Sequence, residues 1–376
     1  MSARHSFIRS DLSQLAAYIA HPGGDTPSIV DRLDTNESPL DLPADIKSKL
    51  SWAYQEQIEA NRYPDGSHRE LKNAIAEYVR ESANLTNSLD SNRISVGNGS
   101  DELIRSILIA TCLGGEGSIL VATPTFSMYG IMARSLGIEV VSIARHETDF
   151  SLDLAAAQQA IDTTNNPPIR VVLVVHPNSP TGNALTSQEM DWLRSLPENI
   201  LVVVDEAYFE FSQTSVVSEL EQRHNWIVLR TFSKAFRLAA HRVGYAIASP
   251  ELIRVLEKLR LPYNLSSFSQ IAAKIALEQR QQILPLVSQT IKERQRVYKA
   301  LETNSNWQIW SSQANFLYLR PRNIDRDRQE NWMARAIADL KTQGTLIRHT
   351  GGGLRITIGT PPENDRTIAR LMDLKL

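Results

Sequence analysis

Short apolar runs rich in β-branched residues recur along the middle of this chain, and longer helical patterns separate them. Runs of this kind suit strands that are buried on both faces. Their alternation with helices predicts an α/β fold with a mostly parallel sheet between two layers of helices. In such a sheet, ligands bind beyond the carboxyl ends of the strands. Seven runs are expected to form the sheet: 94–96, 118–123, 139–144, 171–177, 200–208, 226–232 and 243–249.

The length of the chain, 376 residues, favours two domains of unequal size. From about residue 265 helical patterns dominate, and only short strand-like pieces follow, which predicts a smaller α+β domain. We expect an N-terminal arm at 1–30, a small domain formed by 31–60 with 265–376, and a large cofactor-binding domain at 61–264.

Composition excludes several classes of protein. A formal net charge of −2 with no basic stripe argues against nucleic acid as a partner. The single cysteine, Cys112, rules out an intrachain disulfide and a cysteine-rich metal site, and no histidine has metal-ligand spacing. The N-terminal residues lack the apolar core of a secretory signal, and no run approaches the ~18 apolar residues of a membrane span. We therefore expect a cytoplasmic protein with neither a metal nor a membrane partner.

Reactive side chains follow two of the most apolar runs. Asp205 ends one of them, and Tyr208 stands three residues later. Lys234 follows another, with Ser233 before it and Arg242 eight residues after it. Taken alone, the aspartate also fits a helix cap or a buried ion pair, and the lysine also fits a solvated helix start. Their shared position at the carboxyl edge of the sheet favours a ligand site.

A glycine motif, SVGNGSDE, leads from the first run into a helix. The backbone N–H groups of Gly99, Ser100 and Asp101 would stand at the helix N-terminus, where phosphate binds well. An ordinary N-cap at Ser100 or Asp101 explains the same residues.

Two further motifs follow strands. PTFSMY carries Phe126 and Tyr129, whose rings fit either core packing or stacking on a flat ligand. HPNSPTG, which contains Asn178, is a Pro-Gly turn, and a turn rich in hydrogen-bonding groups at a strand end can also bind a ligand.

Together these residues describe one ligand, pyridoxal 5′-phosphate. Its aldehyde would condense with Lys234, its basic ring nitrogen would meet Asp205, and its phenolic oxygen would meet Tyr208. Phe126 would stack on the ring. The phosphate would be held by Ser100, Asp101, Ser233 and Arg242.

The chain resembles the fold type I aminotransferases, and within them the histidinol-phosphate aminotransferase group. The matching pieces run nearly from end to end: LDTNESPL (33–40), NRYPDG (61–66), GNGSDE (97–102), PTFSMY (124–129), HPNSPTG (176–182), VVDEAYFEF (203–211), RTFSKAFRLAAHRVGY (230–245) and LRITIGT (354–360). The resemblance implies a homodimer that transfers an amino group from L-glutamate to imidazole-acetol phosphate, giving L-histidinol phosphate and 2-oxoglutarate in histidine biosynthesis.

The resemblance also implies roles for residues outside the strand ends. Tyr63 would reach the cofactor phosphate of the partner subunit. Arg355 would bind the glutamate carboxylate and, in the other half-reaction, the phosphate of histidinol phosphate, because a guanidinium fits both anions. Further substrate contacts are expected from Tyr18, Asn315 and Arg348.

The sequence departs from the family pattern at two positions. Relatives usually have asparagine directly before Pro-Thr-Gly, where its amide bonds the phenolic oxygen of the cofactor. This chain has Ser179 there, preceded by Asn178, so either residue, a water or Tyr208 alone could serve that oxygen. His241 stands before Arg242 in place of an apolar residue, and a packing role is expected for it.

Two other classes of function stay open at this point: another enzyme with the same fold, and a protein that is not an enzyme. The same fold could serve an aromatic-amino-acid aminotransferase or a decarboxylase of a phosphorylated amino acid, because a few side chains decide which bond reacts. A non-enzymatic regulator with a relict cofactor site is the other alternative, and the intact set of Lys234, Asp205, Tyr208 and Arg355 argues against it.

Overall fold

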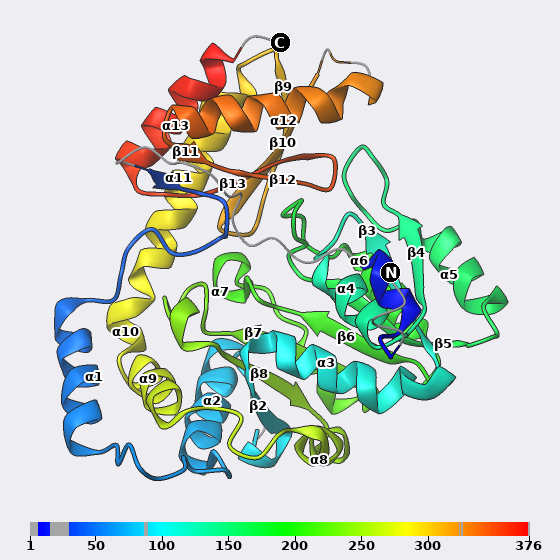
Figure 1. Cartoon of the computed structure of the whole chain (residues 1–376), viewed down its shortest axis with the longest axis vertical. Helices are drawn as coiled ribbons and strands as arrows, with labels where there is room; N and C mark the ends of the chain where they lie inside the picture. The colour runs from blue at the N-terminus through cyan, green and yellow to red at the C-terminus, as the bar shows by residue number, and fades with distance from the viewer. Residues whose placement is uncertain (1–6, 16–29, 86–88, 323, 325, 375–376) are drawn as a thin grey trace.

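The protein is built around a seven-stranded sheet with the strand order β2-β8-β7-β6-β5-β3-β4. The structure is a computed structural model that describes residues 7–15, 30–85, 89–322, 324 and 326–374 (Figure 1). Every predicted run forms one of these strands: β2 (Ile94–Asn98), β3 (Ser118–Thr123), β4 (Val140–Ala144), β5 (Ile169–Val175), β6 (Leu201–Asp205), β7 (Trp226–Thr231) and β8 (Val243–Ala248).

Most of this sheet is parallel. Strands β4, β3, β5, β6 and β7 run in one direction, whereas β8 is antiparallel to both of its neighbours, β7 and β2. The carboxyl ends of β5, β6 and β7 therefore meet at one edge of the sheet. The predicted fold class, an α/β fold with a mostly parallel seven-stranded sheet, is confirmed.

Both faces of the sheet are covered, as the unbroken apolar runs require. In β6, Val202 and Val204 point into one core, and Leu201 and Val203 point into the core on the other face. The first core also contains residues of α1 (Ala44–Glu56), α2 (Arg69–Ser82), α5 (Leu154–Thr163), α6 (Ser187–Ser195) and α9 (Ser267–Glu278). The second contains residues of α3 (Gly99–Cys112), α4 (Met128–Ser135) and α8 (Pro250–Leu259).

A separate four-stranded antiparallel sheet, ordered β12-β13-β10-β9, lies above the large sheet in Figure 1. Its own core includes residues of the long helix α11, which runs from the lower part of the molecule to this sheet. The elements here are β9 (Trp307–Trp310), β10 (Phe316–Pro321), β12 (Arg348–Thr350), β13 (Gly353–Thr357), α11 (Pro285–Glu302), α12 (Arg326–Thr342) and α13 (Pro361–Asp373).

The remaining elements are short. Strand β1 (Asp31–Arg32) pairs in parallel with β11 (Thr345–Leu346), so the segment after residue 30 joins the C-terminal part of the chain. The others are α7 (Phe209–Ser212), α10 (Arg280–Ile283), η2 (Ser10–Gln14), η3 (Ser91–Arg93), η4 (Leu113–Gly115), η5 (Val217–Glu221) and η6 (Ala239–His241). None of the described helices combines the length and the apolar character needed to cross a membrane.

The predicted division into 31–60 with 265–376 and 61–264 stays a prediction, and the cores suggest a refinement. Leu42, Ile46 and Leu50, in and just before α1, pack in the core of the large sheet. Residues of α9 pack in the same core. We propose that α1 and α9 belong to the large domain, and that the small domain begins within α11.

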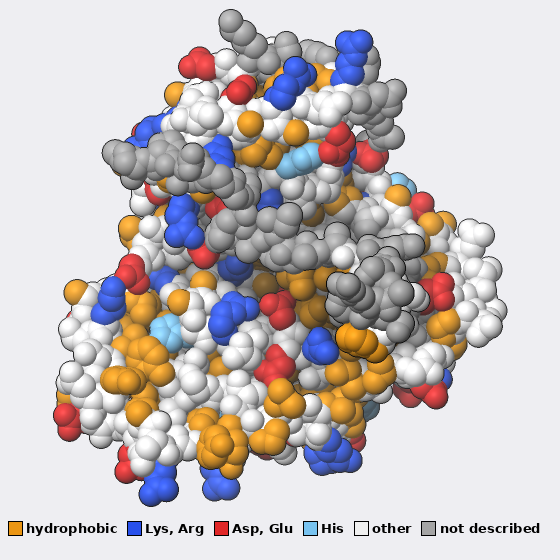
Figure 2. Space-filling view, viewed as in Figure 1, with side chains coloured by type: hydrophobic (Ala, Val, Ile, Leu, Met, Phe, Trp, Pro, Cys, Tyr) orange, Lys and Arg blue, Asp and Glu red, His pale blue; other side chains and the backbone are white. Residues whose placement is uncertain are grey.

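Basic and acidic side chains are interspersed on the face of the molecule shown in Figure 2. No extended area of one sign stands out on the side chains described there, as the small net charge of −2 leads one to expect. The functional argument therefore depends on individual buried charges.

Candidate functional site

A cavity of about 360 Å³ opens at the carboxyl edge of the large sheet. It brings together residues that are far apart in the sequence, because they follow neighbouring strands or begin α3. Eight predicted site residues line it: Ser100, Asp101, Phe126, Asp205, Tyr208, Ser233, Lys234 and Arg242.

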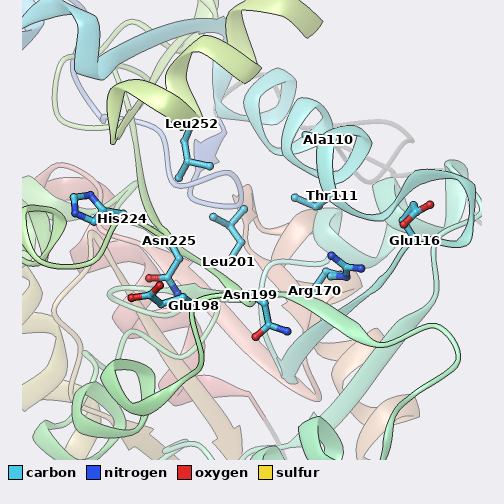
Figure 3. Close-up of a pocket in the computed structure, with 10 residues that line it drawn as sticks. All are labelled: Ala110, Thr111, Glu116, Arg170, Glu198, Asn199, Leu201, His224, Asn225 and Leu252. Carbon is cyan, nitrogen blue, oxygen red and sulfur yellow. The ribbon is translucent and has the colours of Figure 1, made fainter.

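Another cavity, of about 620 Å³, lies at the opposite edge of the sheet (Figure 3). Its lining includes Leu201 at the start of β6 and Asn225 just before β7. Glu116 and Arg170 stand to one side of the opening in Figure 3, and His224 stands on the other. This cavity is the larger of the two, but it contains no lysine and no buried acid, so we place the chemistry at the carboxyl edge.

Lys234 points its amine into the smaller cavity. Nζ donates a hydrogen bond to the backbone carbonyl of Thr35 at 3.0 Å, which is a neutral partner. Burial and, to a smaller extent, the nearby positive charge of Arg355 together lower the pKa of Lys234 from 10.5 to about 8. A substantial fraction of this amine is therefore neutral, and so nucleophilic, near physiological pH.

Asp205 supplies the buried acid and is 3% exposed. Oδ2 accepts a hydrogen bond from the Tyr129 hydroxyl at 2.8 Å, and Oδ1 accepts one from the backbone N–H of Ala207 at 3.0 Å. Burial raises the pKa of this carboxyl to about 6, against the effect of both hydrogen bonds. No cation pairs with Asp205 among the described residues, so a protonated ring nitrogen would meet an unmatched carboxylate.

Tyr129 has a role that the sequence did not reveal. Its motif suggested a ring for packing or stacking, but the residue is fully buried in α4 and holds the carboxyl group of Asp205. Phe126 does line the cavity, and its ring meets Tyr129 edge to face, with the ring centroids 5.4 Å apart. Phe126 precedes α4, whereas Tyr129 lies in its first turn and faces the core. Only the helix start at Met128 could have indicated that the two rings have different roles.

The start of α3 forms one end of the cavity. Gly99 begins the helix with φ +71°, a left-handed conformation that favours glycine, and a Cβ there would displace Nη2 of Arg242, which lies 2.6 Å from its position. Arg242 is held by Asp101, with Nη2 and Oδ2 3.3 Å apart, and its Nη1 approaches Ser233 Oγ at 3.5 Å. A guanidinium, a hydroxyl and a helix N-terminus at Ser100 together suit a phosphate group.

Tyr208 also lines the cavity. Its hydroxyl accepts a hydrogen bond from Asn36 Nδ2 at 2.9 Å. Burial raises the pKa of Tyr208, whereas the charge of Arg355, the hydrogen bond from Asn36 and the Ser179 side chain lower it. Asn36 lies in the LDTNESPL piece that carried the resemblance, and it was not predicted as a site residue.

The HPNSPTG turn presents Ser179, not Asn178, to the cavity. The Asn178 amide instead donates to the carbonyl of Pro124 at 3.1 Å and to Thr181 Oγ1 at 2.6 Å. Its side chain therefore stabilises the turn, and the structure does not bring it to the ligand. His241 packs on Phe268, with the ring centroids 5.1 Å apart, and burial lowers its pKa.

The predicted substrate residues lie beside the cavity on the small sheet and the chain that leads into it. Arg355 in β13 donates from Nη1 to Ser179 Oγ at 3.3 Å and from Nη2 to the carbonyl of Asp34 at 2.7 Å. Arg348 in β12 is its direct partner in the strand register. Asn315 donates to the carbonyl of Asn36 at 3.0 Å.

Tyr63 does not line the cavity of its own chain. Tyr63 is 80% exposed and stacks on Tyr263, with the ring centroids 4.5 Å apart. Tyr18 lies outside the described residues.

The residues present fit pyridoxal 5′-phosphate. A buried carboxyl without a cation, an amine with a lowered pKa and a cradle for an anion lie around one cavity, and these are the three features that its ring nitrogen, aldehyde and phosphate require.

A family model for aminotransferase class I and II matches residues 29–371. The chain belongs to this family. The resemblance to aminotransferases is thereby confirmed at the level of the family.

Curated relatives cover almost the whole chain. The protein named histidinol-phosphate aminotransferase 2 from Nostoc sp. (strain PCC 7120) is 60% identical over 96% of this chain and 96% of its own. The histidinol-phosphate aminotransferase of Trichodesmium erythraeum is 57% identical over 97% of this chain and 98% of its own. Among solved structures, the histidinol-phosphate aminotransferase of Sinorhizobium meliloti in complex with pyridoxal-5′-phosphate shares the fold. It has a TM-score of 0.80 and 22% identity, and the match covers 92% of this chain and 90% of that one.

The lowered pKa of Lys234 can be measured in cofactor-free protein. We expect the dimethylamine made by reductive ¹³C-methylation of Lys234 to titrate with a midpoint near 8, because burial disfavours the charged form. NMR of the labelled protein follows this resonance, and the Lys234→Ala variant, which lacks it, assigns it. A midpoint near the ordinary lysine value of 10.5 would contradict the desolvated site.

Proposed function

We propose that this aminotransferase makes L-histidinol phosphate and 2-oxoglutarate from imidazole-acetol phosphate and L-glutamate, with pyridoxal 5′-phosphate as its cofactor. The observation that carries the proposal is one cavity that is lined by both Lys234 and Asp205, whose carboxyl has no cationic partner among the described residues. Arg355 contacts Ser179 at its edge. Relatives at 57–60% identity that bear the name histidinol-phosphate aminotransferase support the substrate.

The cofactor supplies a reactive aldehyde and a ring that withdraws electrons, and the protein holds both in place. Asp205 keeps a proton on the ring nitrogen, because a buried carboxylate without a cation stabilises that positive charge. Arg242, Ser233 and the start of α3 bind the phosphate. Lys234 would hold the aldehyde end of the cofactor, and its amine would move a proton at the substrate Cα.

Arg355 binds the anionic group of each substrate in turn. Its Nη1 donates to the Ser179 hydroxyl and its Nη2 to the backbone carbonyl of Asp34, and both of these acceptors are neutral. An incoming carboxylate or phosphate therefore gains a charge-assisted bond that these neutral partners cannot supply. Arg348, adjacent in the strand register, adds a second positive charge near the same place, and the backbone contact of Asn315 orders the segment beside it.

The site is completed by a second copy of the chain in this proposal. Tyr63 reaches the cofactor phosphate bound by the partner subunit. Its exposure supports this, as does that of Leu261, which is 70% exposed near the stacking partner Tyr263, because such side chains favour an interface. The enzyme is then a homodimer, and a cytoplasmic location stays a prediction.

The reaction is tested with purified protein and a panel of donors and acceptors. We expect ping-pong kinetics with glutamate, and faster turnover of imidazole-acetol phosphate than of phenylpyruvate. Lys234→Ala should lower turnover at least ~10³-fold, because it removes the proton-transferring amine. Lys299→Ala, at an exposed position of α11, is the matched control and should leave turnover unchanged.

Each alternative gives a different result in this panel. Preference for phenylpyruvate would indicate an aromatic-amino-acid aminotransferase, and release of CO₂ from a phosphorylated amino acid would indicate a decarboxylase. Either outcome, or a sequential rate pattern, would contradict the proposed reaction.

The role of Tyr63 is tested by mixing two variants, Lys234→Ala and Tyr63→Ala. If Tyr63 acts across the interface, a mixed dimer contains one site with both residues intact. We expect turnover after subunit exchange to exceed the sum of the separate variants. If Tyr63 serves its own chain, neither site of the mixed dimer is complete, and turnover would not recover.

A further inference from the structure

The Tyr208 hydroxyl is surrounded by hydrogen-bond donors. Asn36 Nδ2 donates to it at 2.9 Å across 172 positions of sequence. The orientation of this amide follows from its other end, because the Thr357 hydroxyl accepts from the backbone N–H of Asn36 at 2.9 Å and donates to Oδ1 at 3.2 Å. The amide nitrogen of Asn36 is left to face Tyr208.

Ser179 also lines the cavity beside this hydroxyl. Its oxygen accepts a hydrogen bond from Nη1 of Arg355 at 3.3 Å, so its single hydrogen is available for another partner. The Ser179 side chain lowers the pKa of the Tyr208 phenol, which agrees with its hydrogen being directed there.

The hydrogen of the Tyr208 hydroxyl itself is then left for another acceptor. Because the phenolic oxygen accepts a hydrogen bond from Asn36, its own single hydrogen must be donated to another group. The described residues contain no hydrogen bond that the Tyr208 hydroxyl donates, and Tyr208 lines the cavity. We propose that Asn36 and Ser179 are positioning residues that fix the Tyr208 hydroxyl as a hydrogen-bond donor directed into the cofactor cavity.

This inference rests on the proposed function for the identity of the acceptor, the phenolic oxygen of the bound cofactor. It also explains how the chain works with serine directly before Pro180. The serine does not need to reach the cofactor, because it orients the tyrosine that does. Both positioning residues contact β13, Ser179 through Arg355 and Asn36 through Thr357, so the small sheet holds the donor in place.

The test compares Asn36→Asp in two backgrounds. An ionised aspartate has no amide donor and accepts a hydrogen bond, so it should draw the Tyr208 hydrogen away from the cavity. A donor at the ring oxygen favours the cofactor form that has lost a proton, so losing that donor raises the pH midpoint of the cofactor's visible absorbance. The new negative charge raises the midpoint as well, and the Tyr208→Phe background measures that part alone.

We expect Asn36→Asp to raise the midpoint by about one pH unit more in the protein with Tyr208 than in the Tyr208→Phe background, a tenfold difference in the proton equilibrium. Ser179→Ala introduces no charge, and it provides a second test if the Asn36→Asp variant does not fold. It should raise the midpoint only when the Tyr208 hydroxyl is present. The affinity for added pyridoxal 5′-phosphate, measured by equilibrium dialysis, should fall in the same variants.

Equal midpoint shifts with and without the Tyr208 hydroxyl, for both substitutions, would overturn the inference while the proposed function stands. A wild-type protein that takes up no pyridoxal 5′-phosphate would show no visible absorbance to titrate. That result would contradict the proposed function, and the inference with it.

Discussion

Desolvation of one amine and one carboxyl group at the same edge of a buried sheet is the constraint on which this site depends. β6 and β7 are buried along their length and end at neighbouring positions, so the polar residues that follow them must be satisfied inside the protein. Burial pushes the pKa of Lys234 down and that of Asp205 up, and both groups are thereby ready for a ligand that brings an aldehyde and a cation. The start of α3, with Arg242 and Ser233, then provides the position for the phosphate of the same ligand.

Three consecutive residues connect this edge to the small sheet. The carbonyl of Asp34 accepts from Arg355, the carbonyl of Thr35 accepts from Lys234, and the amide of Asn36 donates to Tyr208. The segment therefore contacts the anion-binding arginine, the amine and the phenol at once. Strand β1, which precedes the segment, pairs with β11 in the C-terminal part of the chain, so a movement of that part would reach all three groups together.

The sequence predicted the parts of this arrangement that follow strands. Seven apolar runs became seven strands, and Asp205, Ser233 and Lys234 could be placed because each comes directly at or after a strand end. Tyr129 was assigned to packing or stacking because its bond to Asp205 depends on the phase of α4. Asn36 was missed because its contact joins distant segments, and the direction of the Asn178 amide is set by hydrogen bonds inside its own turn.

The central claim is that one amine, that of Lys234, and one carboxyl group, that of Asp205, hold the two ends of the same pyridine ring system. A crystal structure of the enzyme grown with pyridoxal 5′-phosphate tests it most directly. The account predicts continuous electron density from Lys234 Nζ to the aldehyde carbon, with the ring nitrogen within hydrogen-bond distance of Asp205. Cofactor bound elsewhere, or bound in this cavity with its ring nitrogen directed away from Asp205, would contradict it.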